Sequence, residues 1–213
     1  MLDDARIETL FARFHAARPD ENRRPEAKLD DDPFRSLVGV MLSAQSRDAM
    51  TERACRKLFA VADTPGAILA LDEARLAELI RDAGLYVMKA RNIRRMCTTL
   101  LERHGGEVPR SREALMALPG VGRKSADIML RFVFAEPAVA VDTHVYRVAT
   151  RLGLARGKTE AQVARDLLPR VPERWRWGAH IWLLDHGKEV CRSRKPRCEA
   201  CPMADLCERN GVG

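Results

Sequence analysis

Apolar residues recur every three or four positions along most of the chain, which is the spacing of an amphipathic α-helix. The first helix is expected over Asp3–Ala17, with one face formed by Ile7, Leu10, Phe11 and Phe14. We find no stretch that alternates between apolar and polar residues in the manner of a strand. The pattern therefore predicts an all-α protein of about ten helices.

Proline, glycine and capping residues mark where these helices begin and end. Proline suits the first turn, so Asp32-Pro33 begins a helix. Gly84 and Gly105 fit left-handed caps at helix C-termini. A capping box at Thr159 begins another helix, which is expected to end before Pro169. Other helices are expected over 48–59, 89–104, 111–117, 123–134, 144–152 and 174–186, with two short ones beginning near residues 64 and 72.

The segment Leu118–Ala126, with the sequence LPGVGRKSA, separates two of these helices. Its glycines, Gly120 and Gly122, predict a tight hairpin whose backbone can approach another molecule closely. The next helix begins with free amide N–H groups, which together with the helix dipole form an anion-binding site. Arg123 and Lys124 stand in this first turn, where the dipole disfavours cations. A phosphate ligand accounts for Arg123, and either a reactive neutral amine or a second phosphate contact accounts for Lys124.

Four of the six cysteines lie within 17 residues and are separated by six, two and five residues: Cys191, Cys198, Cys201 and Cys207. Arginine, lysine and proline fill the gaps, so the segment needs a bound metal in order to fold. Four thiolates suit either zinc or an iron–sulfur cluster, and the spacing alone leaves both open. The other two, Cys55 and Cys97, are expected to be buried within helices as small apolar residues.

The chain carries 37 Lys and Arg residues against 30 Asp and Glu, a net charge of +7. This excess favours a polyanionic partner such as nucleic acid, although a basic protein without such a partner is the alternative. No apolar run approaches the ~20 residues that a membrane span needs, so no membrane partner is expected. The acidic N-terminus lacks a signal-peptide core, which predicts a cytoplasmic, reducing location where cysteines stay free or bind metal.

Several segments together resemble the helix-hairpin-helix DNA glycosylases of base excision repair, and most closely the endonuclease III family. They are the hairpin, the cysteine motif, Leu42-Ser43-Ala44-Gln45, Gly84-Leu85-Tyr86 and Val141-Asp142-Thr143-His144. The likeness spans nearly the whole chain. It implies two helical domains that flank a DNA-binding cleft: residues 25–137 with the hairpin, and residues 1–24 with 138–213 around an iron–sulfur cluster.

The resemblance implies a bifunctional DNA glycosylase and AP lyase that removes oxidised pyrimidines from double-stranded DNA and also acts on abasic sites. Lys124 occupies the position of the family's nucleophile. Asp142 would activate this amine or stabilise the cationic sugar. Lys124 could instead hold a phosphate, and Asp142 is also expected to cap the helix that follows it. His144 would support Asp142, or could equally be an ordinary buried histidine.

Base chemistry requires the target nucleotide to leave the stack, and the space it vacates must be filled. The resemblance implies that Gln45 and Leu85 enter the duplex there. Without it, Leu85 could instead belong to the hydrophobic core, and Gln45 could be a surface residue that follows a helix end.

The cysteine spacing resembles the [4Fe–4S] loop of the same family, which favours that cluster over zinc and gives it a structural role. The loop between the first two cysteines would then present Arg192, Arg194, Lys195 and Arg197 to DNA phosphates. The alternative is a solvated basic loop without a ligand.

Two other functions stay open: a monofunctional mismatch glycosylase, whose relatives tend to lack the lysine, and a non-catalytic helix-hairpin-helix protein that binds DNA through phosphate contacts. Five positions depart from the family pattern near the expected DNA surface, and they bear on the range of lesions: Arg47, Ala83, Val87, Met88 and Met116. We expect a monomer, associated with the nucleoid if the source is bacterial.

Overall fold

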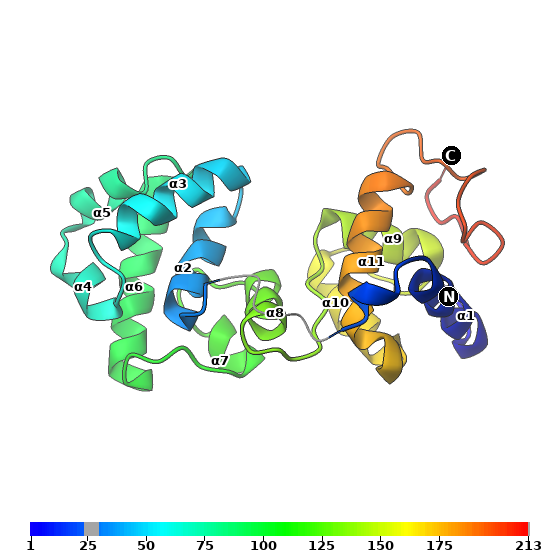
Figure 1. Ribbon diagram of the computed structural model, residues 1–213, viewed down its shortest axis with the longest axis horizontal. Coiled ribbons are helices and arrows are strands. Elements are labelled where there is room, and N and C mark those ends of the chain that lie inside the picture. The colour runs from blue at the N-terminus through cyan, green and yellow to red at the C-terminus, as the bar shows by residue number, and fades with distance from the viewer. Residues whose placement is uncertain (24–29, 213) are drawn as a thin grey trace. The chain divides into compact units, whose positions relative to one another are not determined.

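The computed structural model describes residues 1–23 and 30–212, which form helices and loops without a strand. The chain divides into two compact units (Figure 1), one made of Met1–Pro25 and Glu136–Gly213, the other of Glu26–Ala135. The expected domain boundary at residues 24 and 25 lies outside the described residues. Within the described part, no helix has the length and apolar character that crossing a membrane would require.

The unit Glu26–Ala135 is built around α6, its longest helix. This helix packs against α2, α4 and α5, while α2 also contacts α3 and α8, and α7 contacts α8. Ile93, Met96 and Leu100 of α6 are fully buried. The helices are α2 (Pro33–Ser43), α3 (Asp48–Phe59), α4 (Pro65–Ala70), α5 (Glu73–Leu79), α6 (Tyr86–His104), α7 (Arg112–Met116) and α8 (Arg123–Phe132).

The second unit joins the N-terminal helix to the C-terminal third of the chain. Its α9 packs against α10 and α11, and α1 packs on α11. The rings of Phe14 and Trp182 stack there with centroids 6.2 Å apart. Residues 190–212 form loops and turns, and their Met203 and Leu206 enter the same core. The elements are α1 (Asp4–Ala17), η1 (Pro19–Glu21), α9 (Thr143–Leu152), α10 (Glu160–Arg170), η2 (Glu173–Trp175) and α11 (Arg176–Glu189).

The predicted cap at Gly84 is wrong, whereas the cap at Gly105 is confirmed. Gly105 ends α6 with a φ of 61°. In contrast, α5 already ends at Leu79, and the left-handed residue of the following loop is Leu85, with a φ of 57°. Gly84 is needed for a different reason, because a Cβ there would lie 2.9 Å from the carbonyl oxygen of Gln45.

Several predicted helix limits also shift. Helix α6 begins at Tyr86, before the expected residue 89, and α8 ends at Phe132. Pro169 lies inside the last turn of α10, where its missing N–H costs a single hydrogen bond near the helix end. Trp175 belongs to the short η2, so α11 begins only at Arg176 and extends to Glu189.

The prediction for the two isolated cysteines holds for one of them. Cys97 is fully buried in α6, and burial raises the pKa of its thiol to about 12. Cys55 of α3 is only half-buried, because its side chain lines a surface hollow with Arg35 and Phe59.

Candidate functional site

The predicted hairpin is present between α7 and α8. The Val121 N–H donates to the Leu118 carbonyl oxygen across the turn, at 3.1 Å. Gly120 has a φ of +81°, and a Cβ there would lie 2.9 Å from Met41 Cε and 3.0 Å from Asn92 Cβ. Gly122, by contrast, has no heavy atom within 4 Å of where its Cβ would stand. Gly120 therefore lets the hairpin pack on its unit, and Gly122 leaves its outer surface open to another molecule.

The N-terminus of α8 carries the anion-binding features that the sequence predicted. Gly122 is the N-cap and provides no side-chain hydrogen bond to the first turn, so the leading amide N–H groups stay available. Lys124 is exposed on this turn. Its Nζ forms no hydrogen bond or ion pair with the residues that the structure describes. The amine is therefore free to meet a ligand.

A buried carboxylate that the sequence analysis missed joins the two helices of the hairpin. Asp127 of α8 accepts a hydrogen bond from Arg112 Nε of α7 at 2.6 Å, and Arg123 Nε lies 3.7 Å from its other oxygen. Burial raises the pKa of Asp127, while the hydrogen bond and charge of Arg112 and the charge of Arg123 oppose that rise. Asp127 thus ties α7 to α8 and places Arg123 beside the glycine turn.

Asp142 caps α9, as predicted. The apolar run Val139–Val141 is buried and delivers Asp142 to the helix N-terminus. Its Oδ1 accepts the N–H groups of His144 and Val145 at 2.9 and 2.8 Å. Its Oδ2 takes no hydrogen bond from residues 1–23 or 30–212. The cap thus occupies one carboxylate oxygen and leaves the other for a second task. Asp142 belongs to the unit with the N-terminus, and Lys124 to the other.

His144 is half-buried and contacts Arg147, one turn further along α9. An Nη of Arg147 lies 3.2 Å from His144 Nδ1 and donates to the Gly187 carbonyl at 2.7 Å. The Arg147 Nε donates to the carbonyl of Cys191 at 2.8 Å. One arginine therefore connects the start of α9 to the end of α11 and to the first cysteine of the motif.

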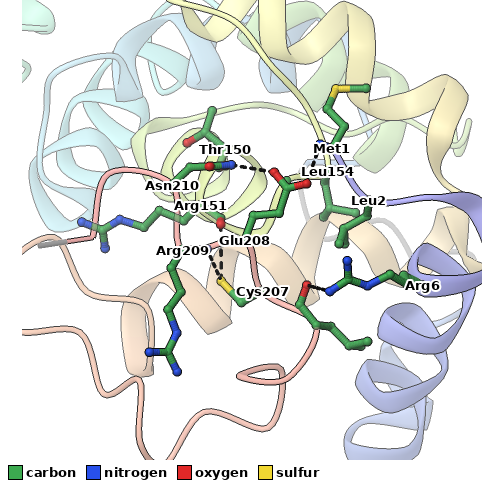
Figure 2. Close-up of polar contacts among 12 residues, drawn as sticks. Met1, Leu2, Arg6, Thr150, Arg151, Leu154, Cys207, Glu208, Arg209 and Asn210 are labelled. Atoms are coloured by element: carbon green, nitrogen blue, oxygen red, sulfur yellow. Dashed lines mark hydrogen bonds and ion pairs between the residues drawn. The ribbon is translucent and has the colours of Figure 1, made fainter.

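The four cysteines of the motif are free thiols, and three of them, Cys191, Cys201 and Cys207, pack against the core of their unit. Figure 2 shows Cys207 beside α9, its Sγ 3.3 Å from both the Arg151 carbonyl oxygen and the Arg209 amide nitrogen. A guanidinium nitrogen of Arg151 lies 3.7 Å from Cys191 Sγ. A guanidinium and a backbone N–H thus donate toward two of the four sulfur atoms, as suits thiolate ligands.

These cysteines also influence one another. Burial raises the pKa of the Cys201 thiol, and the charges of Cys207, Cys191 and Cys198 raise it further. Four thiolates this close need a cationic group between them. The described residues contain no group of three His, Cys, Asp or Glu side chains placed around a single ion. A four-iron cluster does not require one, because each thiolate binds a different iron.

The N-terminal helix holds the loop that carries the last two cysteines. Arg13 donates to both carboxylate oxygens of Asp205, at 2.5 and 2.8 Å, and to the Pro202 carbonyl at 2.9 Å. Arg6 donates to the Leu206 carbonyl at 2.9 Å, a bond drawn in Figure 2. These contacts explain how a segment without regular structure keeps its path over the core.

The basic loop lies between the first two cysteines. Its four cations are exposed, and none forms an ion pair with any described part of the chain: Arg192, Arg194, Lys195 and Arg197. The backbone of the loop is nevertheless held, since the Arg192 carbonyl accepts from Arg151 at 2.8 Å. The loop therefore presents unneutralised charge from a fixed backbone, which suits phosphate contacts.

Gln45 and Leu85 lie together on the other unit. Both are exposed, Leu85 by 51%, so the alternative that placed Leu85 in the core is wrong. Both have left-handed backbones, with φ values of 54° and 57°. They line a hollow of about 100 Å³ together with Met88 and Gly120 of the hairpin. The structure therefore brings both candidate duplex-entering residues next to the glycine turn.

The five positions that depart from the family pattern divide into two groups. Val87, Met88 and Met116 expose 49%, 53% and 43% of their surface. Arg47 is also exposed, at the N-cap of α3. The Ala83 side chain is buried, so its effect can only be on the packing of the loop before Leu85.

Comparison with protein families gives two matches. Residues 38–173 match the HhH-GPD superfamily of base excision DNA repair proteins. Residues 191–207 match the iron–sulfur binding domain of endonuclease III and contain all four cysteines of the motif. The sequence prediction of a [4Fe–4S] cluster is confirmed, and the zinc alternative is set aside.

Related proteins agree with these matches. Endonuclease III of Treponema pallidum is 44% identical over 213 residues, covering 100% of this chain and 99% of the relative. Endonuclease III of Escherichia coli K12 is 46% identical over 190 residues, covering 89% and 90%. The solved structure of a trapped endonuclease III–DNA covalent intermediate, an estranged-adenine complex, matches with a TM-score of 0.84 at 36% identity, covering 98% and 97%. The all-α fold with two helical domains is thereby confirmed.

Proposed function

Because the chain belongs to the endonuclease III family of HhH-GPD base excision repair proteins, we propose that its glycosylase and AP lyase chemistry is carried out by Lys124 and Asp142. The protein binds DNA and is an enzyme of base excision repair. The observation that carries the assignment is the Lys124 amine, exposed and without a protein partner beside the glycine turn. The covalent intermediate trapped with the related endonuclease III supports a nucleophile of this kind.

The proposed reaction begins with attack of the neutral Lys124 amine on C1′ of the target nucleotide. The bond from C1′ to the base breaks, and the base leaves with its electron pair and then takes up a proton. Opening of the sugar ring gives a protonated Schiff base between Lys124 and C1′. This cation acidifies the C2′ hydrogens, so loss of one proton expels the 3′ phosphate oxygen and cuts the strand. Hydrolysis of the Schiff base then restores the amine.

Asp142 is proposed to take the proton that the attacking amine loses, or to stabilise positive charge as it develops on the sugar. Its surroundings suit this task, since the cap uses Oδ1 and leaves Oδ2 without a bond from the described residues. The two backbone N–H groups also fix the orientation of the carboxylate. The side chains of His144 and Arg147 hold the start of α9 in place, and neither forms a hydrogen bond with the Asp142 carboxylate.

The remaining predicted residues are proposed to bind the duplex. Gln45 and Leu85 would fill the space left by the displaced nucleotide, and their exposure supports this role. The first turn of α8, with Arg123, would hold a phosphate near the target. The basic loop, held by Arg151 and by four thiolates that bind the cluster, would contact phosphates elsewhere on the strand. When bound, the [4Fe–4S] cluster supplies structural bracing for that loop.

The substrate is proposed to be duplex DNA that contains oxidised pyrimidines, such as thymine glycol, or abasic sites, and the active form a monomer. The apolar surface of Val87 and Met88 next to Leu85 would affect which lesions are accepted. With DNA as its substrate, the protein would act where the cell keeps its DNA, which in a bacterium is the nucleoid.

The test of this proposal is incubation with damaged duplexes in the presence of borohydride, which reduces a Schiff base to a stable amine. We expect a covalent protein–DNA adduct on thymine glycol and abasic duplexes that is lost in Lys124→Ala. A panel of lesions, scored separately for base release and strand nicking, would define the substrate range. Base release without an adduct would indicate a monofunctional glycosylase. Binding without either reaction on any lesion would indicate a non-catalytic DNA-binding protein.

A further inference from the structure

Gln45 and Leu85 share an unusual backbone. Each is a non-glycine residue in the left-handed region, with φ values of 54° and 57°. Such residues are strained and persist only where their surroundings fix them. The surroundings here are two loops in contact: the Gln45 loop, residues 44–47 between α2 and α3, and the Leu85 loop, residues 80–85 between α5 and α6. A Cβ on Gly84 would stand 2.9 Å from the Gln45 carbonyl oxygen, so the backbones nearly touch.

The side chain of Lys89 in α6 bonds to the Gln45 loop at the point where that loop meets the Leu85 loop. Lys89 of α6 is only 5% exposed, and it is the one lysine among the buried residues of the described chain. Its Nζ donates to the Leu42 carbonyl oxygen at 2.7 Å and to Ser46 Oγ at 2.9 Å. The same Ser46 Oγ accepts the Gly84 N–H at 3.0 Å. Lys89 therefore bonds directly to the residue after Gln45 and, through Ser46, to the residue before Leu85.

The charge of Lys89 is accommodated without a carboxylate. The described residues form no ion pair with its ammonium group. Leu42 lies in the last turn of α2, where unpaired carbonyl groups and the negative end of the helix dipole favour a cation. Burial lowers the pKa of Lys89, because the charged form loses solvation there. Burying a charged lysine that is held only by dipoles costs more free energy than burying an apolar side chain of similar size. Its hydrogen bonds to the two loops are what an apolar residue could not provide.

We propose that Lys89 is a positioning residue that locks Gln45 and Leu85 into one rigid element, so that both enter the duplex together when the target nucleotide is displaced. The inference rests on the proposed function, in which these two residues fill the vacated space. Lys89 touches neither the DNA nor the reacting atoms in this account. It acts through Ser46 and the Leu42 carbonyl, and its loss leaves Lys124 chemically intact while the displaced state becomes harder to reach.

The proposal predicts a defect that depends on the DNA. Lys89→Met keeps the apolar stem and removes the donors. We expect its single-turnover rate of borohydride trapping to fall roughly tenfold relative to wild type on a thymine glycol paired with adenine within a duplex, the factor that corresponds to losing a charged hydrogen bond. On a thymine glycol inside an unpaired bulge, where no base pair has to open, its rate should be close to that of wild type. Arg56→Met, which loses only an exposed ion pair with Glu52 within α3, is the matched control and should match wild type on both DNAs.

A second readout follows the displacement of the target nucleotide directly. With 2-aminopurine placed opposite an abasic site in a duplex, Lys89→Met should show a smaller rise in fluorescence on binding than wild type, because the 2-aminopurine is unstacked in a smaller fraction of the complexes. Ser46→Ala leaves Lys89 in place and removes the hydroxyl that joins the two loops, so it should show the same pattern in weaker form. It serves as the test variant if Lys89→Met folds poorly.

Two results would overturn the inference. One is a Lys89→Met rate that is reduced by the same factor on paired and bulged DNA, which indicates a general structural defect. The other is a rate equal to wild type on both DNAs. A wild-type protein that forms no adduct with either DNA would instead contradict the proposed function, and with it the premise of this inference.

Discussion

Asp142 combines two tasks that substitutions can separate. As N-cap it accepts two backbone N–H groups on Oδ1, which an asparagine side-chain oxygen can also do. As a proton acceptor or a stabiliser of positive charge it needs the negative carboxylate, which asparagine lacks. The same residue therefore has a structural role that a neutral isostere keeps and a chemical role that it loses.

Asp142→Asn is expected to slow single-turnover base release by roughly 100-fold or more, the scale of a lost acid–base group. Its free energy of unfolding should stay within about 0.5 kcal/mol of wild type, since asparagine caps helices as well as aspartate. Asp142→Ala should lose the same activity and about 1 kcal/mol of stability in addition. Equal base-release rates for wild type and Asp142→Asn would reduce Asp142 to a cap.

Among the larger elements, the cysteine loop has the least structure of its own. Residues 190–212 contain no helix or strand among those described, so their path depends on the bound cluster and on side chains from α1 and α9. Arg13 of α1 makes a bidentate contact with Asp205, and its hydrogen bonds, with a smaller effect of its charge, lower the pKa of that carboxyl to about 2. The N-terminal helix therefore holds a segment of the cysteine loop that lies almost 200 residues away in sequence.

Arg13→Ala is expected to lose its visible cluster absorption several times faster than wild type under a chelator and oxygen. The helical circular dichroism of the fresh protein should be unchanged, because the contact is on the surface. Arg75→Ala, which breaks an exposed pair with Glu78 in the other unit, serves as control. Identical decay for Arg13→Ala and this control would mean that α1 does not stabilise the loop.

For the molecule as a whole, the net charge of +7 contributes to DNA binding where positive side chains are not paired with carboxylates of the protein. Many surface arginines are already paired, such as Arg56 with Glu52 and Arg75 with Glu78. The cations of the basic loop are not paired with described residues, and a fixed backbone presents them. These are the charges that should release counterions from DNA.

The double variant Arg192→Ala/Arg194→Ala is expected to reduce the slope of log affinity against log salt concentration by about two. Affinity would be measured by fluorescence anisotropy with an undamaged duplex at several salt concentrations. Arg56→Ala/Arg75→Ala removes the same formal charge from paired residues and should leave the slope nearly unchanged. Equal slopes for the two double variants would show that the basic loop is only solvated.

Local motifs made much of this molecule predictable. The glycine turn, the capping aspartate before α9 and the four cysteines each depend on residues near one another in sequence, so spacing and residue type are sufficient to locate them. Helix limits were less certain, because tertiary contacts decide them. The structure puts Gly84 at a close approach between loops, where the sequence suggested a cap.

The contacts that support the site were missed for a physical reason. Periodicity reports which face of a helix is apolar, but not what lies opposite that face. Lys89 shares the buried face of α6 with Ile93, Met96 and Leu100, and a lysine in an apolar stripe was the available signal. It went unused because the helix was expected to begin at that residue. Arg147 gave no local signal, since its acceptors on Gly187 and Cys191 are 40 and 44 residues away.

The central claim is that one exposed amine, that of Lys124, forms the bond to the sugar. The most direct measurement is to reduce the complex with borohydride on an abasic duplex, digest protein and DNA, and locate the deoxyribose remnant by mass spectrometry. The account predicts a single modified peptide, with the added mass on Lys124. A remnant on another lysine or on the N-terminal amine, with Lys124 unmodified, would contradict it.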